Sequence, residues 1–352
     1  MEGEFKPRVL GGFPVGPDGR VHTTFTHNPS SLRLSSVGPN LQNIPRGSGS
    51  EYAKWVKEIF IASPGSLFWE RDFSAIEAVL VGYFAGAPNY IRFAKMGVHA
   101  YLASHIVGRP IDLKWSNADI KAYIKKLKGE EPVAYDTAKR IVHGSNYMMT
   151  AVKMSYEYPE TFPTPKKAHA LQGLYFDLFP EIPAWHRELA IRVDGTKRRR
   201  PEGGEVVDPW TLGVAYAQNP FGYIHRFYNV LDWTLLEAED NGGKREWVWS
   251  FGEDAKRLVS FLPQSTAAAI IKRAGKRLWY DHPEVGESMR LWIHDSILGE
   301  SSEASVEHAL ELSQRVMEEP IPQLPLDPAW GMGEYLSIGT EAKVGRVWAA
   351  MR

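Results

Sequence analysis

The chain has 352 residues, enough for one large domain or two to three smaller ones. Its 41 lysines and arginines nearly balance its 42 aspartates and glutamates, so only local patches could attract a polyanion. The absence of cysteine excludes disulfides and Cys-built metal sites and fits an intracellular, cytoplasmic protein, while no apolar run approaches the ~20 residues that span a membrane.

The predicted elements begin with loops. Residues 1–50 are rich in Gly, Pro, Ser and Asn, which favours turns and short strands. Alternating apolar residues then predict a strand at Leu67–Phe73, and a helix is expected at Ala75–Phe84. Ser74 and Glu77 have the spacing of a capping box, which predicts that they close the first turn of that helix.

Helices are predicted over most of residues 98–200, which also carry the basic runs 121–128 and 196–200. Such runs are usually solvated faces; if they contact nucleic acid, binding should weaken steeply with salt. Alternating and aromatic residues predict a hairpin within 210–233.

The C-terminal third starts with an amphipathic helix predicted at 264–280. A strand is predicted at 291–298, followed by a helix at 303–318 and a Pro-rich tail. With helices between mostly β segments, the fold class is α+β.

Residues 291–298 read LWIHDSIL, in which Asp295 interrupts an otherwise apolar strand. A buried carboxylate is costly unless a cation, a metal or strong donors compensate it. The plainer alternative is a strand end at which Asp295 begins a turn. Asp72 closes another apolar strand, and two such aspartates in one sheet could share divalent cations that activate a 3′-hydroxyl and stabilise a departing pyrophosphate. The residues alone do not show that the two aspartates approach each other.

Seven segments, in order, resemble the family A DNA polymerases, the bacterial DNA polymerase I type. DFSAIE (72–77), AKRIVHGSNYMMTA (138–151) and LWIHDSIL (291–298) are similar to motifs A, B and C of that family. The other four segments are GRVHTTF (19–25), RLSSVGPNLQNIP (33–45), QSTAAAIIKRA (264–274) and KVGRVW (343–348). The resemblance runs from about residue 19 to the end.

The resemblance implies a right-hand polymerase with an antiparallel-sheet palm and helical fingers. The expected limits are an N-terminal extension at 1–19, palm at 20–84 and 212–352, and fingers at 85–211. The thumb and the exonuclease domain are absent from this pattern. A second polypeptide that supplies the thumb and a 3′–5′ exonuclease domain is therefore expected, as in a split phage-type polymerase inside a bacterial host. A truncated piece of a longer chain is the alternative.

The implied substrates are dNTPs and primer–template DNA. Two Mg²⁺ ions would be held by Asp72, Asp295 and the Phe73 carbonyl. In motif B, Lys139 would contact the dNTP phosphates, His143 would lie near base and sugar, and Tyr147 would lie at the templating position. With Tyr135, these residues recur every four positions, which predicts one face of a helix.

Four positions depart from the family pattern. Tyr135 replaces an arginine, His143 a phenylalanine or tyrosine and Met148 a glycine, and Ser296 replaces the glutamate after the HD pair. Arg140 and Arg92 are the candidates to replace the missing arginine.

By resemblance, Glu77 is the gate below the sugar that excludes a 2′-hydroxyl, and His99 lies near the nucleotide phosphates. His294 would contact the primer-terminal phosphate. Polar residues that could test base-pair geometry in the minor groove are Arg33, Asn40, Gln42, Asn43 and Gln264.

The predicted function is template-directed addition of dNTPs to a primer 3′-hydroxyl. The alternative is a non-catalytic DNA-binding scaffold subunit that retains the fold. Retention of Asp72, Asp295 and Lys139 argues against a scaffold, which has no physical need for two costly acids. Glu77 argues against a third option, an RNA-synthesising relative.

Overall fold

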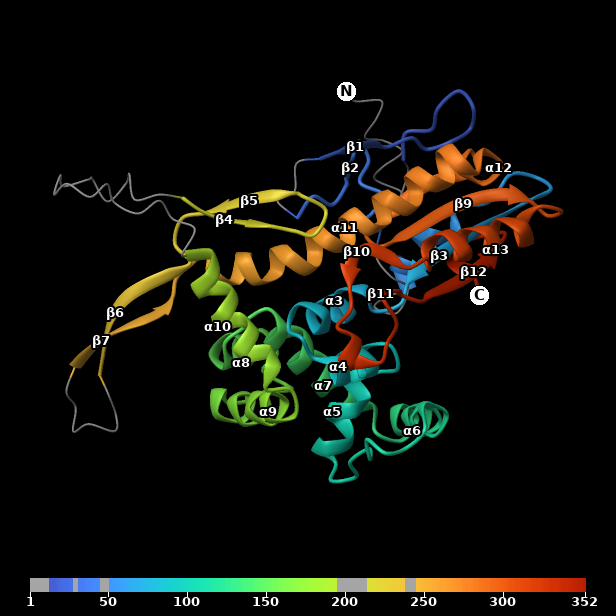
Figure 1. The fold of residues 1–352 in the computed structure, drawn as a ribbon. Coiled ribbons are helices and arrows are strands. Elements are labelled where there is room, and N and C mark those ends of the chain that lie inside the picture. The colour runs from blue at the N-terminus through green and yellow to red at the C-terminus, as the bar shows by residue number, and fades with distance from the viewer. Residues whose placement is uncertain (1–12, 28–30, 45–50, 195–213, 238–244) are drawn as a thin grey trace, which may run out of the picture. The chain divides into compact units, whose positions relative to one another are not determined.

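The computed structural model describes residues 13–27, 31–44, 51–194, 214–237 and 245–352 (Figure 1). Its contacts divide the chain into unit 1, which comprises residues 1–76 and 264–352, and unit 2, which comprises residues 77–263. These boundaries differ from the limits expected for palm and fingers, and that division stays a prediction. The mixture of helices with antiparallel sheets confirms the α+β class. None of the described helices is long and apolar enough to cross a membrane.

Unit 1 is built around an antiparallel sheet. The described strands of unit 1, which form this sheet and two smaller ones, are β1 (Thr24–Thr26), β2 (Ser35–Val37), β3 (Ser66–Phe73), β8 (Met289–Ile293), β9 (Ser296–Ser302), β10 (Ile321–Pro325), β11 (Tyr335–Leu336) and β12 (Thr340–Gly345). Its helices are α2 (Glu51–Glu58), α12 (Pro283–Gly286), α13 (Val306–Met317) and the short 3-10 helices η3 (Pro328–Trp330) and η4 (Trp348–Ala350).

Unit 2 is mainly helical. Its helices are α3 (Ile76–Phe84), α4 (Pro88–Ala94), α5 (Val98–Ile106), α6 (Asn117–Glu130), α7 (Pro132–Asn146), α8 (Ala151–Glu157), α9 (Pro165–Leu178) and α10 (Glu181–Asp194). Two hairpins follow: β4 (Ala215–Gln218) with β5 (Ile224–Phe227), and β6 (Leu231–Glu237) with β7 (Arg245–Phe251). The boundary between the units at residues 263 and 264 falls within helix α11 (Ala255–Asp281).

The main sheet has the strand order β12-β3-β9-β8, so β3 lies between two strands from the far end of the chain. Side chains alternate between the two faces of a strand. On β3, Trp69 and Arg71 point to the face that α13 covers, where the Arg71 guanidinium donates to the Leu310 carbonyl at 2.5 Å. Glu70 and Asp72 therefore share the opposite face.

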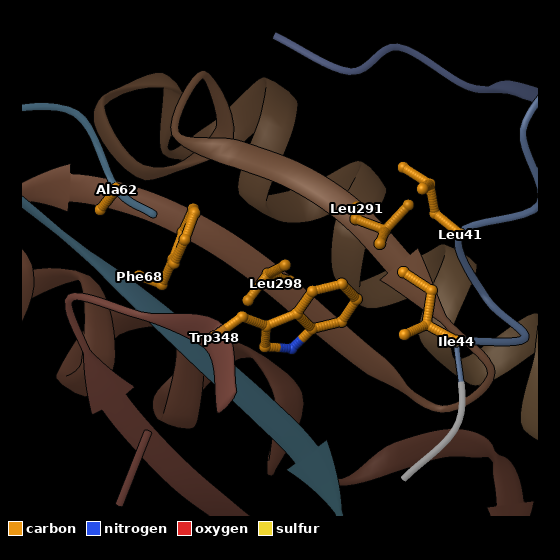
Figure 2. Packing of buried hydrophobic residues seen from close by; sticks show 7 residues of the cluster. All are labelled: Leu41, Ile44, Ala62, Phe68, Leu291, Leu298 and Trp348. Carbon is orange, nitrogen blue, oxygen red and sulfur yellow. The ribbon is translucent and has the colours of Figure 1, made fainter. Parts of the chain in front are cut away.

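One end of that opposite face is closed by apolar side chains (Figure 2). The cluster comprises Leu41, Ile44, Ala62, Phe68, Leu291, Leu298 and Trp348. It joins the N-terminal loop and η4 to the strands of the sheet, and apolar burial of this kind contributes ~25 cal/mol per Å². The polar end of the same face is thus supported by a packed core.

The predicted strand at 291–298 is wrong, because the segment is a tight hairpin. Ile293 pairs with Ser296, so His294 and Asp295 form a two-residue turn between β8 and β9. His294 has φ 55°, a left-handed conformation that hairpin turns of this length commonly require. Asp295 lies in a turn, as the plainer alternative proposed.

The predicted capping box at Ser74 and Glu77 is also wrong. Helix α3 begins at Ile76, after Ala75 with φ 52°, so Glu77 is its second residue and not the third. The Glu77 carboxylate instead accepts a hydrogen bond from Tyr147.

Other predictions hold with changed limits. The strand before Asp72, the 98–200 helices and the helix after residue 303 are confirmed, as is a hairpin within 210–233. The basic run 196–200 lies outside the described residues. Helix α11 is longer than predicted and, at residues 267–271, buried on all sides instead of amphipathic. The β6–β7 hairpin and the strands of the tail were not predicted.

The end of α7 is fixed by the buried Asn146, whose side-chain oxygen, side-chain nitrogen and backbone carbonyl are each hydrogen-bonded. Its side chain receives the Tyr175 hydroxyl at 2.5 Å and donates to the Tyr90 hydroxyl at 2.7 Å. The His186 Nε2–H donates to its carbonyl oxygen at 3.1 Å. Burial raises the pKa of Tyr90 to about 12. A fully satisfied buried network of this kind specifies one position for the helix end.

Candidate active site

Asp72 and Asp295 occupy adjacent positions in unit 1. Asp72, the penultimate residue of β3, pairs with Ser296 at the start of β9. Asp295 directly precedes Ser296, and its backbone carbonyl accepts a hydrogen bond from the Phe73 N–H at 3.2 Å. The structure therefore brings together two aspartates that are far apart in the sequence.

Both aspartates line a cavity of about 70 Å³ within unit 1. Its polar lining comprises Gln42, Lys57, Glu70, Asp72, His294, Asp295 and Ser296. Gln42 and His294 were predicted to contact DNA, so four of the predicted site residues meet here. Lys57, Glu70 and Ser296 complete the lining.

The donor set suits a hard divalent cation. Magnesium takes oxygen ligands, keeps several waters and is usually bound by only one or two carboxylates together with phosphates. Among the described residues no three acids or histidines form a ready-made metal cluster. The buried Trp348 Nε1–H has no acceptor among the described residues, and its ring lines the cavity, so a water or phosphate oxygen would satisfy it. Asp72 and Asp295 thus fit a magnesium site, whereas Phe73 is not part of the cavity lining and its carbonyl stays a predicted ligand.

Lys57 brings a positive charge to the same cavity. It belongs to α2, and its Nζ lies 4.6 Å from the centroid of the Trp348 ring. No sequence signal could have identified it, because its position depends on how η4 and α2 pack together. Glu70 could have been found, since residues two apart on a strand share a face.

In unit 2, α7 presents Lys139 and His143 at the surface, as the four-residue spacing predicted. Both line a cavity of about 290 Å³ together with Arg140. Arg140 pairs with Asp136 at 2.8 Å and lies 4.6 Å from the Tyr158 ring. Two cations therefore lie on one concave surface, which suits a phosphate group.

Arg92 does not replace the missing arginine. Its three guanidinium nitrogens donate to Asn117, Leu113 and Trp115, at 2.9 to 3.0 Å. These bonds fix the loop before α6. Of the two candidates, Arg140 is the one that lies beside Lys139.

His99 lies against Tyr135, with ring centroids 5.9 Å apart. Burial, reinforced by the charges of Lys139, His143 and Lys128, lowers the pKa of His99 to about 4. The imidazole is therefore neutral at pH 7 and adds no charge beside Lys139. The structure brings His99 into the electrostatic neighbourhood of motif B, as expected from the resemblance.

Glu77 and Tyr147 form a pair within unit 2. The Tyr147 hydroxyl donates to the Glu77 carboxylate at 2.5 Å, and the Tyr147 and His143 rings are 5.5 Å apart in an edge-on arrangement. Tyr147 was predicted on the same helix face as Lys139 and His143, but it lies just past the end of α7, as its C-cap residue. Two residues assigned to nucleotide selection are thus in direct contact.

The residue after Tyr147 explains one departure from the family. Met148 has φ 57°, its N–H bonds to the Ser145 carbonyl, and the next N–H bonds to the Gly144 carbonyl. This is a Schellman helix end, in which the left-handed position is usually glycine. The glycine expected from the resemblance falls at this left-handed position.

The residues predicted to contact DNA are in unit 1 but do not all line the cavity. Asn40 is exposed and accepts from the backbone N–H groups of Gln42 and Asn43, which shapes the loop after β2. Gln42 accepts from Ser36 N–H and donates to the Trp292 carbonyl at 2.9 Å, so it also holds this loop to β8. Arg33, before β2, and Gln264, on α11, are half-buried.

Of the two basic runs, residues 121–128 are described by the structure and lie on α6. Lys126 pairs with Glu130 at 3.8 Å, and Lys128 lies 5.3 Å from the Tyr135 ring. Part of the positive charge of this run is therefore balanced by side chains of unit 2 itself.

Comparison with known proteins agrees with this geometry. The chain is 30% identical over 321 residues to the thermostable DNA polymerase I of Thermus aquaticus, and 26% identical over 320 residues to DNA polymerase I of Deinococcus radiodurans. Each alignment includes 90% of this chain but only 32% and 28% of the relative, so the chain spans about a third of their length.

The fold is similar to that of the solved POL domain of Pol1 from M. smegmatis, in complex with a DNA primer-template and dNTP. The TM-score is 0.66 at 20% identity, over 98% of this chain and 50% of that one. The model of the family "DNA polymerase family A" matches residues 14–199, just over half of the 352 residues. The chain therefore belongs to DNA polymerase family A.

Proposed function

We propose that this chain carries the polymerase active site of a family A enzyme and adds dNTPs to a primer 3′-hydroxyl as a template directs. The observation that carries the proposal is the meeting of Asp72 and Asp295 in one polar cavity. Magnesium bound there would supply the charge that lowers the pKa of the 3′-hydroxyl and stabilises the departing pyrophosphate. Asp72, Asp295 and the Phe73 carbonyl would hold it.

The other residues position the substrates. Lys139 and Arg140, at the surface of α7, would bind the dNTP phosphates, with Asp136 paired to Arg140 and the neutral His99 adding no charge. Glu77, held by Tyr147, would bar a 2′-hydroxyl. His294 and Gln42 would contact the primer end, while Asn40, Asn43, Arg33 and Gln264 would contact the duplex.

We place the activity in the cytoplasm of a bacterial cell, because the similar polymerases are bacterial. The second polypeptide expected from the sequence stays a prediction. The same holds for a split, phage-encoded origin.

The test is extension of a labelled primer on a short template, with this chain, Mg²⁺ and each dNTP in turn. Template-correct addition by the wild-type chain is expected, and Asp295→Ala should slow it roughly 10³-fold or more, because the carboxylate would hold the magnesium that stabilises the transition-state charge. Asp177→Asn, at an exposed site on α9, is the matched control and should extend normally.

Addition that proceeds equally in Asp295→Ala would contradict the assigned site. Binding of the primer–template without any addition, by a folded wild-type chain, would favour the scaffold alternative.

A further inference from the structure

Glu70 is an acidic residue of the cavity to which the proposed function assigns no role. It lies two residues before Asp72 on β3, so both side chains are on one face of the sheet, and both line the same cavity. Leu298 on β9 stands opposite Glu70, and Ser296 stands opposite Asp72. Ser296 is therefore diagonal to Glu70, within reach of its carboxylate.

A hydrogen bond joins these two residues. The Ser296 Oγ–H donates to Glu70 Oε1 at 3.0 Å, with the Ile293 carbonyl as a second acceptor at 3.1 Å. Ser296 is only 2% exposed, so its hydroxyl needs an acceptor within the protein. It also pairs with Ile293 across the turn that carries Asp295. Glu70 is thus tied to the base of the Asp295 turn.

Glutamates at positions 70 and 296 would exclude each other. A carboxylate placed at 296 would meet that of Glu70 at about hydrogen-bond distance, where the two negative charges repel each other. A hydroxyl there converts the repulsion into a hydrogen bond. The serine at 296 and the glutamate at 70 therefore form one compatible pair.

We propose that Glu70 supplies the third negative charge of the Asp72–Asp295 site, in place of the acid that motif C lacks at Ser296. The inference rests on the function proposed for that site. Because its carboxylate accepts the Ser296 hydroxyl and so acts through the Asp295 turn, Glu70 is a positioning residue. It holds Ser296 and the Asp295 turn, and it attracts the cation and its bound water from outside the ligand set.

The test measures Mn²⁺ binding to the full chain by electron paramagnetic resonance, without DNA or nucleotide. Glu70→Gln should weaken Mn²⁺ binding roughly 10- to 100-fold, as loss of a residue behind metal ligands commonly does. Glu307→Gln is the matched control: Glu307 is exposed on α13, which covers the other face of the sheet, and its change should leave binding unaltered.

A swap separates charge from simple packing. Ser296→Glu alone should lower the melting temperature, because two carboxylates then meet, and Glu70→Ser alone should lower Mn²⁺ affinity, because a negative charge is lost. Glu70→Ser combined with Ser296→Glu should restore both, because a single carboxylate again faces a hydroxyl. A double variant no better than either single variant would overturn the proposal.

The outcomes also separate this inference from the function on which it rests. If Asp295→Ala abolishes Mn²⁺ binding while Glu70→Gln leaves it unchanged, the metal site stands and the role of Glu70 is wrong. If Asp295→Ala binds Mn²⁺ like the wild type, the assigned metal site itself is wrong.

Discussion

Glu300 in unit 1 and His186 in unit 2 are both buried ionisable groups, but only one of them is charged. In unit 1, Glu300 is 5% exposed yet ionised: burial opposes its charge, but hydrogen bonds from Ser63, Arg20 and Arg290 outweigh burial and lower its pKa to about 2. In unit 2, His186 is 4% exposed and neutral, since burial lowers its pKa to about 4 despite its bond to Asn146. Hydrogen-bonded cations keep the first group charged, whereas burial keeps the second group neutral.

The difference predicts which unit is sensitive to acid. The stabilisation from Glu300 is complete above its unfolded pKa of 4.5 and is lost as the pH falls towards 2. His186 is neutral in both states above pH 6.5; below that, the unfolded chain binds the proton first, so stability falls between pH 6.5 and 4. Unit 2 should therefore weaken at a pH at which unit 1 is still intact.

The largest expected effect concerns a basic side chain at the surface of unit 2, Lys139. Lys139→Ala should lower kcat/KM for dNTP addition roughly 10²- to 10³-fold, because a phosphate contact made in the transition state is lost. Steady-state primer extension measures it. Lys139→Arg should retain much of the rate, and Lys166→Ala, on exposed α9, should retain all of it. If Lys139→Ala and Lys166→Ala lowered kcat/KM equally, the effect would come from overall positive charge and not from a specific phosphate contact of Lys139.

Removing the charge of Glu300 should test the paired interior of unit 1. Glu300→Gln keeps the shape but weakens the bonds to Arg20 and Arg290, which now measure 2.7 and 3.2 Å. We expect about 2–3 kcal/mol less free energy of unfolding in urea. Glu303→Gln, exposed just beyond β9, should change it little. If both variants lowered the free energy of unfolding by the same amount, the buried ion pairs of Glu300 would contribute no more to stability than an exposed carboxylate does.

Acid should test the neutral interior of unit 2. Protonation of His186 alone should remove about 2 kcal/mol of the free energy of unfolding between pH 7 and pH 5. His186→Gln keeps a donor for the Asn146 carbonyl and removes the titration, so the loss should shrink, with His99 responsible for the remainder. Urea unfolding at several pH values measures it. A slope unchanged by the substitution would contradict the neutral state of His186.

The smallest expected effect is a gain. Met148→Gly should stabilise the end of α7 by about 1 kcal/mol, because glycine adopts a positive φ without strain. Met149→Gly, at the next position and not at positive φ, should destabilise instead. Thermal unfolding of both variants checks the sign. A loss at both positions would mean that the Met148 side chain contributes more than its backbone costs.

Local signals in the sequence predicted most of what is local in the structure. The apolar alternation before Asp72 predicted β3, and the four-residue spacing of Lys139 and His143 predicted their common surface. The pairing of Asp72 with Ser296 joins segments more than two hundred residues apart, and only the ordered motifs of a known family indicated it. Nothing local encodes which strand will be a neighbour.

The errors have the same origin. LWIHDSIL is as apolar as a strand, but His294 and Asp295 form its turn, a choice decided by pairing across β8 and β9. Glu77 has the spacing of a capping residue, yet its carboxylate is claimed by Tyr147 from another helix. Tertiary partners prevailed over local propensity in both cases.

The position of β3 in its sheet has a consequence for biosynthesis. Both of its neighbours, β9 and β12, come from the last part of the chain, so β3 emerges from the ribosome long before either can pair with it. Until then its backbone donors and acceptors are available to wrong partners, the usual route to aggregation during slow, non-local folding. A nascent chain can complete its α-helical hairpins early, but it cannot assemble Asp72 with Asp295 until nearly all of it has been translated.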